Sequence, residues 1–123
     1  VLDPAVIEAD NEWKMYTGDI ERGSIVLAKS NDGLNFVKET EFNVGGNVPE
    51  IVKLDSGKYA LYFCARGGIE VVTSTNGVFS WSSSSVAIES TRGREEIVCD
   101  PSIIKTKEGK WVMYYKIQES PTR

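Results

Sequence analysis

The stretch from Asp3 to Gly18 reads DPAVIEADNEWKMYTG, and two later stretches repeat its layout. They read VPEIVKLDSGKYALYFCA from Val48 and DPSIIKTKEGKWVMYYKI from Asp100. Each contains a proline, an aliphatic run, a polar turn and a run rich in aromatic residues, which together predict a β-hairpin. The expected turns are Asp10-Asn11, Asp55-Ser56-Gly57 and Lys107-Glu108-Gly109. The prolines Pro4, Pro49 and Pro101 recur at intervals of 45 and 52 residues.

A second hairpin follows the first two of these stretches. It reads SIVLAKSNDGLNFV from Ser24 and IEVVTSTNGVFSWS from Ile69, and its Asn-Asp-Gly and Asn-Gly turns are strong hairpin signals. A four-stranded repeat of this length is typical of a propeller blade. We therefore predict about ten strands and no helix: blade one in residues 1–45, blade two in 46–97 and the first half of blade three in 98–123. A β-sandwich is the alternative, but it does not explain why the motifs recur in phase.

Charge and composition exclude several classes of function. The chain has 123 residues, 14 basic and 18 acidic side chains and a net charge of -4, with no basic stripe for nucleic acid or an anionic membrane. No apolar run approaches the ~18 residues of a membrane span. Because there is no His, zinc sites and Ser-His or Cys-His catalysis are excluded, and we expect no cofactor and no metal site. The compartment stays open.

Cys64 and Cys99 are the two cysteines of the chain. They have no C-x-x-C spacing, and two cysteines are too few for a disulfide scaffold. We interpret them as buried structural thiols, since a free Cys packs like a small hydrophobe. A bridge between them stays open because its geometry cannot be judged from sequence.

The repeated hairpins resemble the first, second and third blade openings of glycoside hydrolase family 43 and its five-bladed furanosidase relatives. AKSNDGLNF and VTSTNGVFSW also resemble the Ser-x-Asp-Gly-x-x-aromatic hairpin of that superfamily. The Asp-box of sialidases fits less well because Gly33 directly follows Asp32. The resemblance covers nearly the whole chain but only about half of the family's propeller. It implies an all-β fold, a partial five-bladed β-propeller of about 2.5 four-stranded blades.

The resemblance also implies catalytic roles for two carboxylates. Asp3, opening blade one, matches the general base or nucleophile, and Asp100, opening blade three, matches the residue that tunes pKa and orientation. The family's general acid is a Glu of blade four, which would lie beyond Arg123. Whether this chain is itself an enzyme therefore stays open. From the residues alone, Asp-Pro can also be a simple turn-to-strand signal, with an extended Asp before a Pro at the first strand position.

Strand order predicts which loops surround a site. If each inner strand starts at the active face, the loops 18–24, 43–50, 65–69 and 89–100 lie on that face, which we call the near face. Glu50 and Arg66 adjoin blade strands there and are the predicted substrate-binding residues. These loops also hold Arg22, Arg92, Arg94, Glu95 and Glu96. Trp13, Trp81 and Trp111 are interpreted as packing between blades.

Three functions are consistent with this sequence. The first is a glycosidase that hydrolyses glycosidic bonds in the complete protein, and the second is a carbohydrate-binding or structural propeller half without catalysis. The third is a protein-interaction propeller, since a fold does not fix a function. The expected partners are a carbohydrate ligand and a second copy of the chain, because two and a half blades leave an open strand edge.

Overall fold

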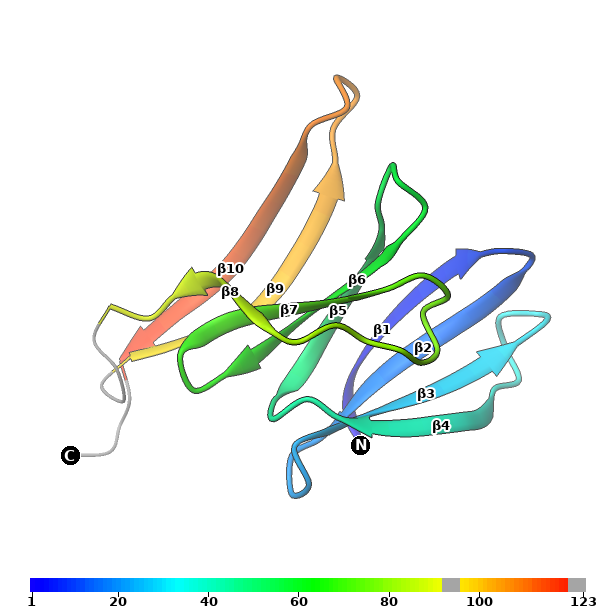
Figure 1. Cartoon of the computed structure of the whole chain (residues 1–123), viewed down its shortest axis with the longest axis horizontal. Coiled ribbons are helices and arrows are strands. Elements are labelled where there is room, and N and C mark those ends of the chain that lie inside the picture. Colours follow the sequence, from blue (N-terminus) through cyan, green and yellow to red (C-terminus); the bar gives the residue numbers. More distant parts are fainter. Residues whose placement is uncertain (92–95, 120–123) are drawn as a thin grey trace.

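The structure, a computed structural model, describes residues 1–91 and 96–119. Its strands are β1 (Leu2–Ala9), β2 (Glu12–Asp19), β3 (Ser24–Ser30), β4 (Val37–Asn43), β5 (Asn47–Lys53), β6 (Tyr59–Ala65), β7 (Gly68–Ser74), β8 (Ser85–Glu89), β9 (Glu96–Lys105) and β10 (Trp111–Glu119). They form three antiparallel sheets in chain order, β1–β4, β5–β8 and β9–β10 (Figure 1). None of the described residues forms a helix long and apolar enough to cross a membrane. The prediction of an all-β partial propeller is confirmed.

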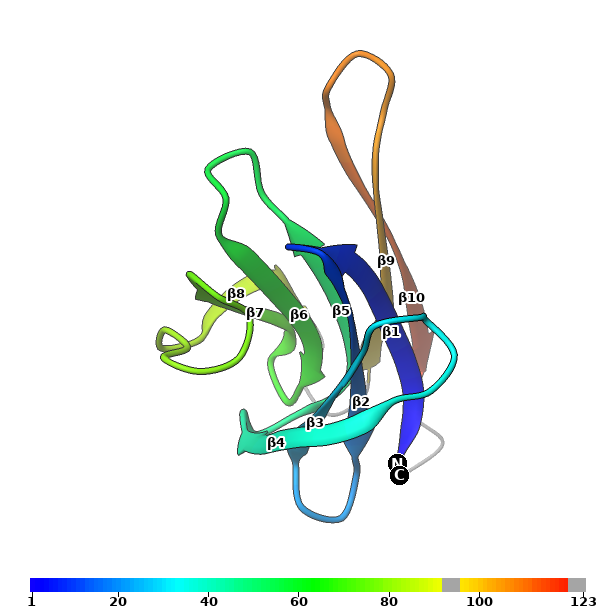
Figure 2. The same cartoon turned by 90° about the vertical axis from the view of Figure 1, so that its right-hand side faces the viewer.

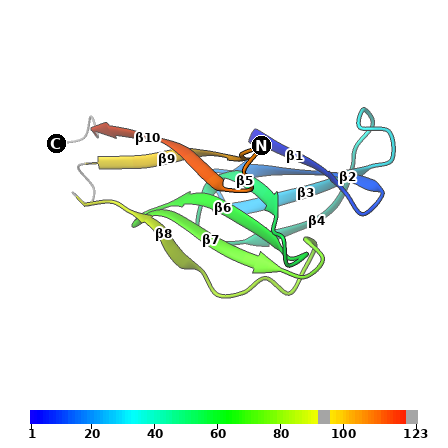
Figure 3. The ribbon, with the colours of Figure 1, turned by 90° about the horizontal axis from the view of Figure 1, so that it is seen from above.

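The three sheets lie beside one another in chain order. Inner strand β5 contacts both β1 and β9. Seen from above, these inner strands lie toward one side of the molecule, whereas the outer strands β4 and β8 lie toward the other (Figure 3). We refer to β1–β4 as blade one, to β5–β8 as blade two and to the β9–β10 hairpin as half of blade three.

The hairpin turns form where the sequence predicts them, for local conformational reasons. Asp10 and Asn11 both have positive φ, 56° and 65°, as the central residues of a type I′ turn require. In the β3–β4 loop, Asp32 Oδ1 accepts the backbone N–H groups of Leu34 and Asn35 at 2.8 and 2.9 Å. In the β7–β8 loop, Asn76 Oδ1 likewise accepts the backbone N–H groups of Val78 and Phe79, at 2.8 and 3.1 Å. The two loops are therefore built alike.

Each inner strand contains the same β-bulge at its proline. Asp3-Pro4 lies opposite Thr17 alone, Val48-Pro49 opposite Phe63, and Asp100-Pro101 opposite Tyr115. The residue before each proline has positive φ, between 54° and 57°. The expectation of an extended residue followed by Pro at the first strand position is therefore wrong. Proline is tolerated here because the bulge already interrupts the hydrogen-bond ladder.

Blades one and two pack face to face around buried aromatic and aliphatic side chains. Tyr16, Tyr59 and Phe63 are fully buried, together with Ile25, Leu27 and Leu61. The Tyr16 hydroxyl donates a 2.6 Å hydrogen bond to the carbonyl of Gly77, which joins blade one to the β7–β8 loop. A Cβ at Gly77 would lie 2.8 Å from that hydroxyl, so only glycine fits this contact at its φ of 74°.

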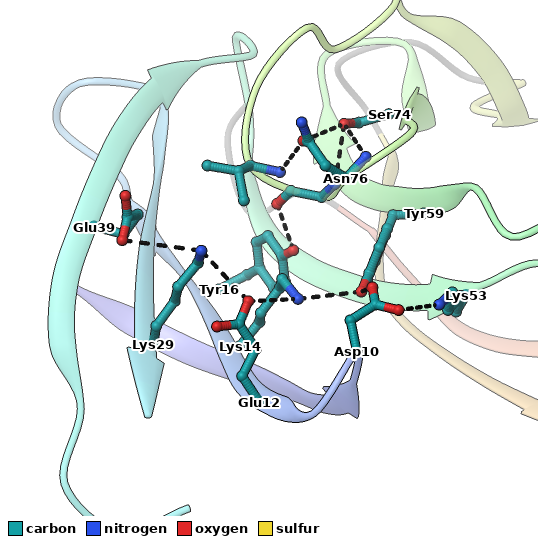
Figure 4. A network of polar contacts seen from close by, with 12 residues as sticks. Asp10, Glu12, Lys14, Tyr16, Lys29, Glu39, Lys53, Tyr59, Ser74 and Asn76 are labelled. Carbon is teal, nitrogen blue, oxygen red and sulfur yellow. Dashed lines mark hydrogen bonds and ion pairs between the residues drawn. The ribbon is translucent and has the colours of Figure 1, made fainter. Parts of the chain in front are cut away.

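A buried lysine reinforces the same interface on the side of the β1–β2 turn (Figure 4). Lys14 is 1% exposed, forms an ion pair with Glu12 at 3.0 Å and donates to the Tyr59 hydroxyl at 3.1 Å. Tyr59 in turn donates a short hydrogen bond to Asp10, whose other oxygen pairs with Lys53 at 2.7 Å. The hydrogen bonds from Lys53 and Tyr59 hold the pKa of Asp10 below its usual value. The buried ammonium of Lys14 is thus compensated, as a buried charge requires, by the partly exposed carboxylate of Glu12.

Cys64 and Cys99 form a disulfide between β6 and β9. The interpretation as two free thiols is therefore wrong. The reason lies in the register: Cys64 is on the second strand of blade two, and Cys99 directly precedes the bulge of the next inner strand. Two residues that are 35 positions apart meet only because the blades stack in this order. The disulfide thereby fastens the half-blade to blade two.

The β9–β10 hairpin is buried only near this attachment, at Val98, Cys99 and Pro101. The hairpin extends past the other sheets (Figure 2) and exposes Tyr114 and Ile117. Trp111 is 39% exposed beneath the Lys105 ammonium, so its prediction as an interblade residue is wrong for the described chain. Trp13 is half-buried under Gly33 of its own sheet. Trp81 does pack between blades, stacked on Phe42.

Replacing both cysteines by alanine should lower the free energy of unfolding by about 4 kcal/mol, the loop-entropy value for a closed loop of this length. Urea unfolding of the oxidised chain, the reduced chain and Cys64→Ala/Cys99→Ala measures the loss. Reductant should have no further effect on the double variant. Identical midpoints for the oxidised and reduced chains would contradict the prediction.

Candidate functional site

The two candidate catalytic carboxylates occupy equivalent positions on β1 and β9. Asp3 and Asp100 each precede the proline of a bulge, and both are exposed. Val48 takes this position on β5, which lies between them. A bulge redirects the side chain of its strand, and bulges are frequent beside active sites. Positive φ is well tolerated by Asp, whereas for the β-branched Val48 it is a strained conformation.

Asp100 is held from two sides. Its backbone N–H donates to Cys64 Sγ at 3.3 Å, so the disulfide fixes the backbone at the bulge. Its carboxylate pairs with Lys116 Nζ on β10 at 2.9 Å, with both side chains about half exposed. Sequence reasoning missed Lys116. The signal was available, because the repeat aligns Lys116 with Gly18 and Cys64, directly across from the start of each bulge.

Asp3 is held less firmly. No hydrogen bond or ion pair of its carboxylate occurs among the described residues, and Val1 and Leu2 beside it are also exposed. The pocket beside it, about 480 Å³, is lined by Val1, Leu2 and the end of β2 with its following loop. Asp3 therefore presents a solvent-facing carboxylate next to an open hollow on the near face.

The carboxylate of Glu50 is hydrogen-bonded within the protein. Its Oε2 accepts the backbone N–H of Ile103 at 2.7 Å, so it ties β5 to β9. Burial raises the pKa of Glu50 above its usual value, and the backbone hydrogen bonds from Ile103 and Ile51 oppose that effect. The predicted contact with a substrate is untested, but the present geometry gives Glu50 a role in joining blades.

Arg66 is exposed on the near face and lines a hollow of about 380 Å³. Its neighbours there include Cys64, Glu96 and Val98, so the hollow lies over the joint of blades two and three. Glu96 is oriented by the hydroxyl of Ser90 and the backbone N–H of Thr91, at 3.4 and 3.2 Å. Arg66 and Glu96 thus place both signs of charge on one wall. Arg92, Arg94 and Glu95 lie outside the described residues.

The described residues contain no cluster of three or more His, Cys, Asp or Glu side chains that could hold a metal ion. The near face carries separate carboxylates together with the cationic side chains of Arg66 and Lys116. Such groups can bind hydroxyls and stabilise or transfer a proton at a sugar.

No protein-family model matches the chain, and neither does any curated protein. Several solved structures do match the chain. A thermostable family-43 glycoside hydrolase superposes with a TM-score of 0.75 over 92% of this chain at 15% identity. An endo-1,5-alpha-L-arabinanase from Thermotoga petrophila gives 0.72 over 97% at 16% identity. A family-43 arabinoxylan arabinofuranohydrolase from Bacillus subtilis, in complex with cellotetraose, gives 0.70 over 92% at 18% identity.

The chain has the fold of the family-43 glycoside hydrolases. It spans 40%, 37% and 32% of the lengths of those three structures, so it corresponds to less than half of their chains. The predicted resemblance to part of a five-bladed propeller is confirmed at the level of fold. Identities below one fifth carry no residue's role across, so the roles of Asp3, Asp100, Glu50 and Arg66 stay predictions.

Glu50→Gln should stabilise the chain at pH 7 relative to the wild type, with a smaller gain at pH 4. The raised pKa means that the folded state prefers protonated Glu50. That contribution is present below the usual value of 4.5 and is lost as the pH rises through the folded-state pKa. Gln keeps an acceptor oxygen for Ile103 and carries no charge to bury.

The measurement is urea unfolding of both proteins between pH 4 and pH 8, with exposed Glu8→Gln as the matched control. The difference for Glu50→Gln should grow with pH, while that for Glu8→Gln stays flat. A pH-independent difference at Glu50 would argue against a burial-shifted carboxyl.

Proposed function

We propose that this chain is the first part of a carbohydrate-active propeller whose near face binds a saccharide, and that the complete protein hydrolyses glycosidic bonds. The observation that carries the proposal is the Asp-Pro bulge, which occurs at equivalent points of β1 and β9 in a fold that solved glycoside hydrolases share. It puts carboxylates at matching places on inner strands. Leu2, beside Asp3, lines one hollow, and Arg66 and Glu96 line another at the joint of blades two and three.

Glycosidic bond cleavage uses two carboxyl groups, one that assists the leaving oxygen as an acid and one that acts as base or nucleophile. In this proposal Asp3, free of protein partners among the described residues, is the base or nucleophile. Asp100, fixed by Cys64 and Lys116, orients the sugar and tunes its neighbours. The resemblance places the proton donor in a fourth blade, which these 123 residues do not include.

The second candidate function is carbohydrate binding without hydrolysis. The ion pair between Asp100 and Lys116 favours it, because a paired carboxylate and ammonium can both bond to sugar hydroxyls without taking part in bond cleavage. For the 123-residue chain by itself, this is the activity that we propose.

The purified chain should therefore bind neutral arabino- or xylo-oligosaccharides without releasing reducing sugar. Asp3→Asn and Asp100→Asn should each weaken near-face binding about tenfold, which corresponds to one lost hydrogen bond to a charged group. Isothermal titration with 1,5-α-arabinohexaose and xylohexaose measures affinity, and backbone NMR shifts locate the site. Asp55→Asn, in a turn on the opposite face, is the control. Near-face affinity unchanged by both variants would sink the proposal.

We further propose that the 123-residue chain pairs with a second copy through β10. Among residues 1–91 and 96–119 no strand pairs with the outer edge of β10, and Tyr114 and Ile117 are 65% and 60% exposed beside it. Open edges and exposed apolar faces of this kind are normally covered. Antiparallel pairing of β10 with its copy about a two-fold axis would fill the open edge and bring the two sets of exposed side chains close together.

Sedimentation of the purified chain should show a species of twice 13.6 kDa. Tyr114→Lys/Ile117→Lys should convert it to monomer, because lysines repel across a two-fold contact. Leu34→Lys, at an 83% exposed site in the β3–β4 loop, should leave the dimer intact. A compact wild-type monomer refutes the pairing.

A further inference from the structure

A groove of about 470 Å³ runs along the flank of the molecule between blades one and two. Its walls are the end of β4 with the following residues, and the segment that leads from the β7–β8 loop into β8. Figure 2 shows β4 and β8 on this flank, away from β9 and β10. Both flanking sheets have all four of their strands. The groove is therefore a property of two whole blades and does not depend on the half-blade.

An aromatic pair forms one wall of the groove. Phe42 and Trp81 stack with ring centroids 5.1 Å apart and an interplanar angle of 20°. Tyr16 meets the indole edge-on at 6.3 Å, so the pair is backed by the core. Because one ring comes from each blade, the aromatic surface is rigid. One face of each ring is covered by the other ring, and the part of the pair that lines the groove is apolar surface against which the apolar face of a sugar ring can pack.

The indole N–H of Trp81 is the one buried side-chain polar atom without a hydrogen-bond partner among the described residues. A buried donor is nearly always satisfied by protein, water or a ligand, and leaving it unmet costs free energy. Trp81 lines the groove. Because this nitrogen has almost no accessible surface, a ligand oxygen can meet it only where binding opens the groove wall around the indole.

Neutral hydroxyls follow Trp81 directly along the chain and also line the groove. Ser82 is committed to the fold, since its Oγ accepts the Thr73 N–H at 2.9 Å. Ser83 and Ser84 are exposed, and their hydroxyls make no hydrogen bond within the part of the chain that the structure describes. None of the residues that line the groove carries a charge. A charged ligand would find no partner there, whereas a polyhydroxylated neutral one would.

We propose that this flank groove is a second binding site for a neutral oligosaccharide. A sugar ring lies against Phe42 and Trp81, and its hydroxyls bond to Ser83 and Ser84. The site goes beyond the proposed function, because neither Asp3, Asp100, Glu50 nor Arg66 lines it. Such a site would hold one part of a polysaccharide on the flank while the near face binds another part of the same polysaccharide.

The test uses the full 123-residue chain with xylohexaose, 1,5-α-arabinohexaose and cellotetraose as probes, followed by titration and backbone NMR. Ser83→Arg fills the groove from an exposed position, and it should weaken flank binding at least about tenfold. Ser85→Arg, two residues on and outside the groove, is the matched control and should bind as the wild type does. Trp81→Phe keeps a ring but removes the N–H, and it should also lose affinity.

The outcomes separate this site from the near face. Asp100→Asn should leave the NMR shifts of residues 42–45 and 81–84 intact, while Ser83→Arg removes them and leaves the near face intact. The proposal is overturned if no probe shifts residues 42–45 and 81–84 at millimolar concentration, or if Ser83→Arg binds as tightly as the control. Unchanged thermal unfolding of Ser83→Arg excludes misfolding as the cause. Displacement of every probe by an unrelated neutral peptide would overturn it as well.

Discussion

The contact between the bulge of one inner strand and the second strand of the preceding blade determines how the blades stack. At the first joint Gly18 leaves space for the next blade: a Cβ there would lie 3.1 Å from the backbone nitrogen of Val48. At the second joint the equivalent residue is Cys64, which bonds covalently to Cys99. One position in the repeat thus serves as a tight van der Waals contact in one blade and as a covalent link in the next. The third copy, Lys116, faces its own bulge and pairs with Asp100.

The two faces of the chain differ in the contacts that their charged side chains make. On the side of the β1–β2 turn, Lys14, Tyr59 and Asp10 form a compensated network between blades one and two (Figure 4). Burial raises the pKa of Tyr59, so it remains a hydrogen-bond donor to Asp10. On the near face the carboxylates of Asp3 and Asp100 are exposed. The network adds rigidity away from the candidate site, and the disulfide fixes the backbone at Asp100 itself while its carboxylate stays exposed.

The sequence predicted what is local and periodic. Turn residues such as Asp10-Asn11 and the repeated Asn-Gly loops carry their own conformational preference, so the hairpins and their order could be read directly. Features that depend on how the blades stack could not be predicted in this way. The disulfide joins residues of different blades, and the positive φ before each proline follows from a bulge that only the register reveals. Trp111 was misjudged because periodicity assigns a strand position but not whether another sheet covers it.

The bulge also explains why the residue before the proline can change without loss of the fold. Its backbone conformation is the same for Asp3, Val48 and Asp100, although Val adopts positive φ only with strain. Blade two retains the strained bulge without a carboxylate, so the bulge itself is needed for stacking, and the side chain on it is free to vary. Asp at this position costs the fold little, since it tolerates the conformation and faces solvent. A propeller of this kind can therefore place a carboxylate on any chosen inner strand, and the number of carboxylates on its near face depends on which blades carry one at this position.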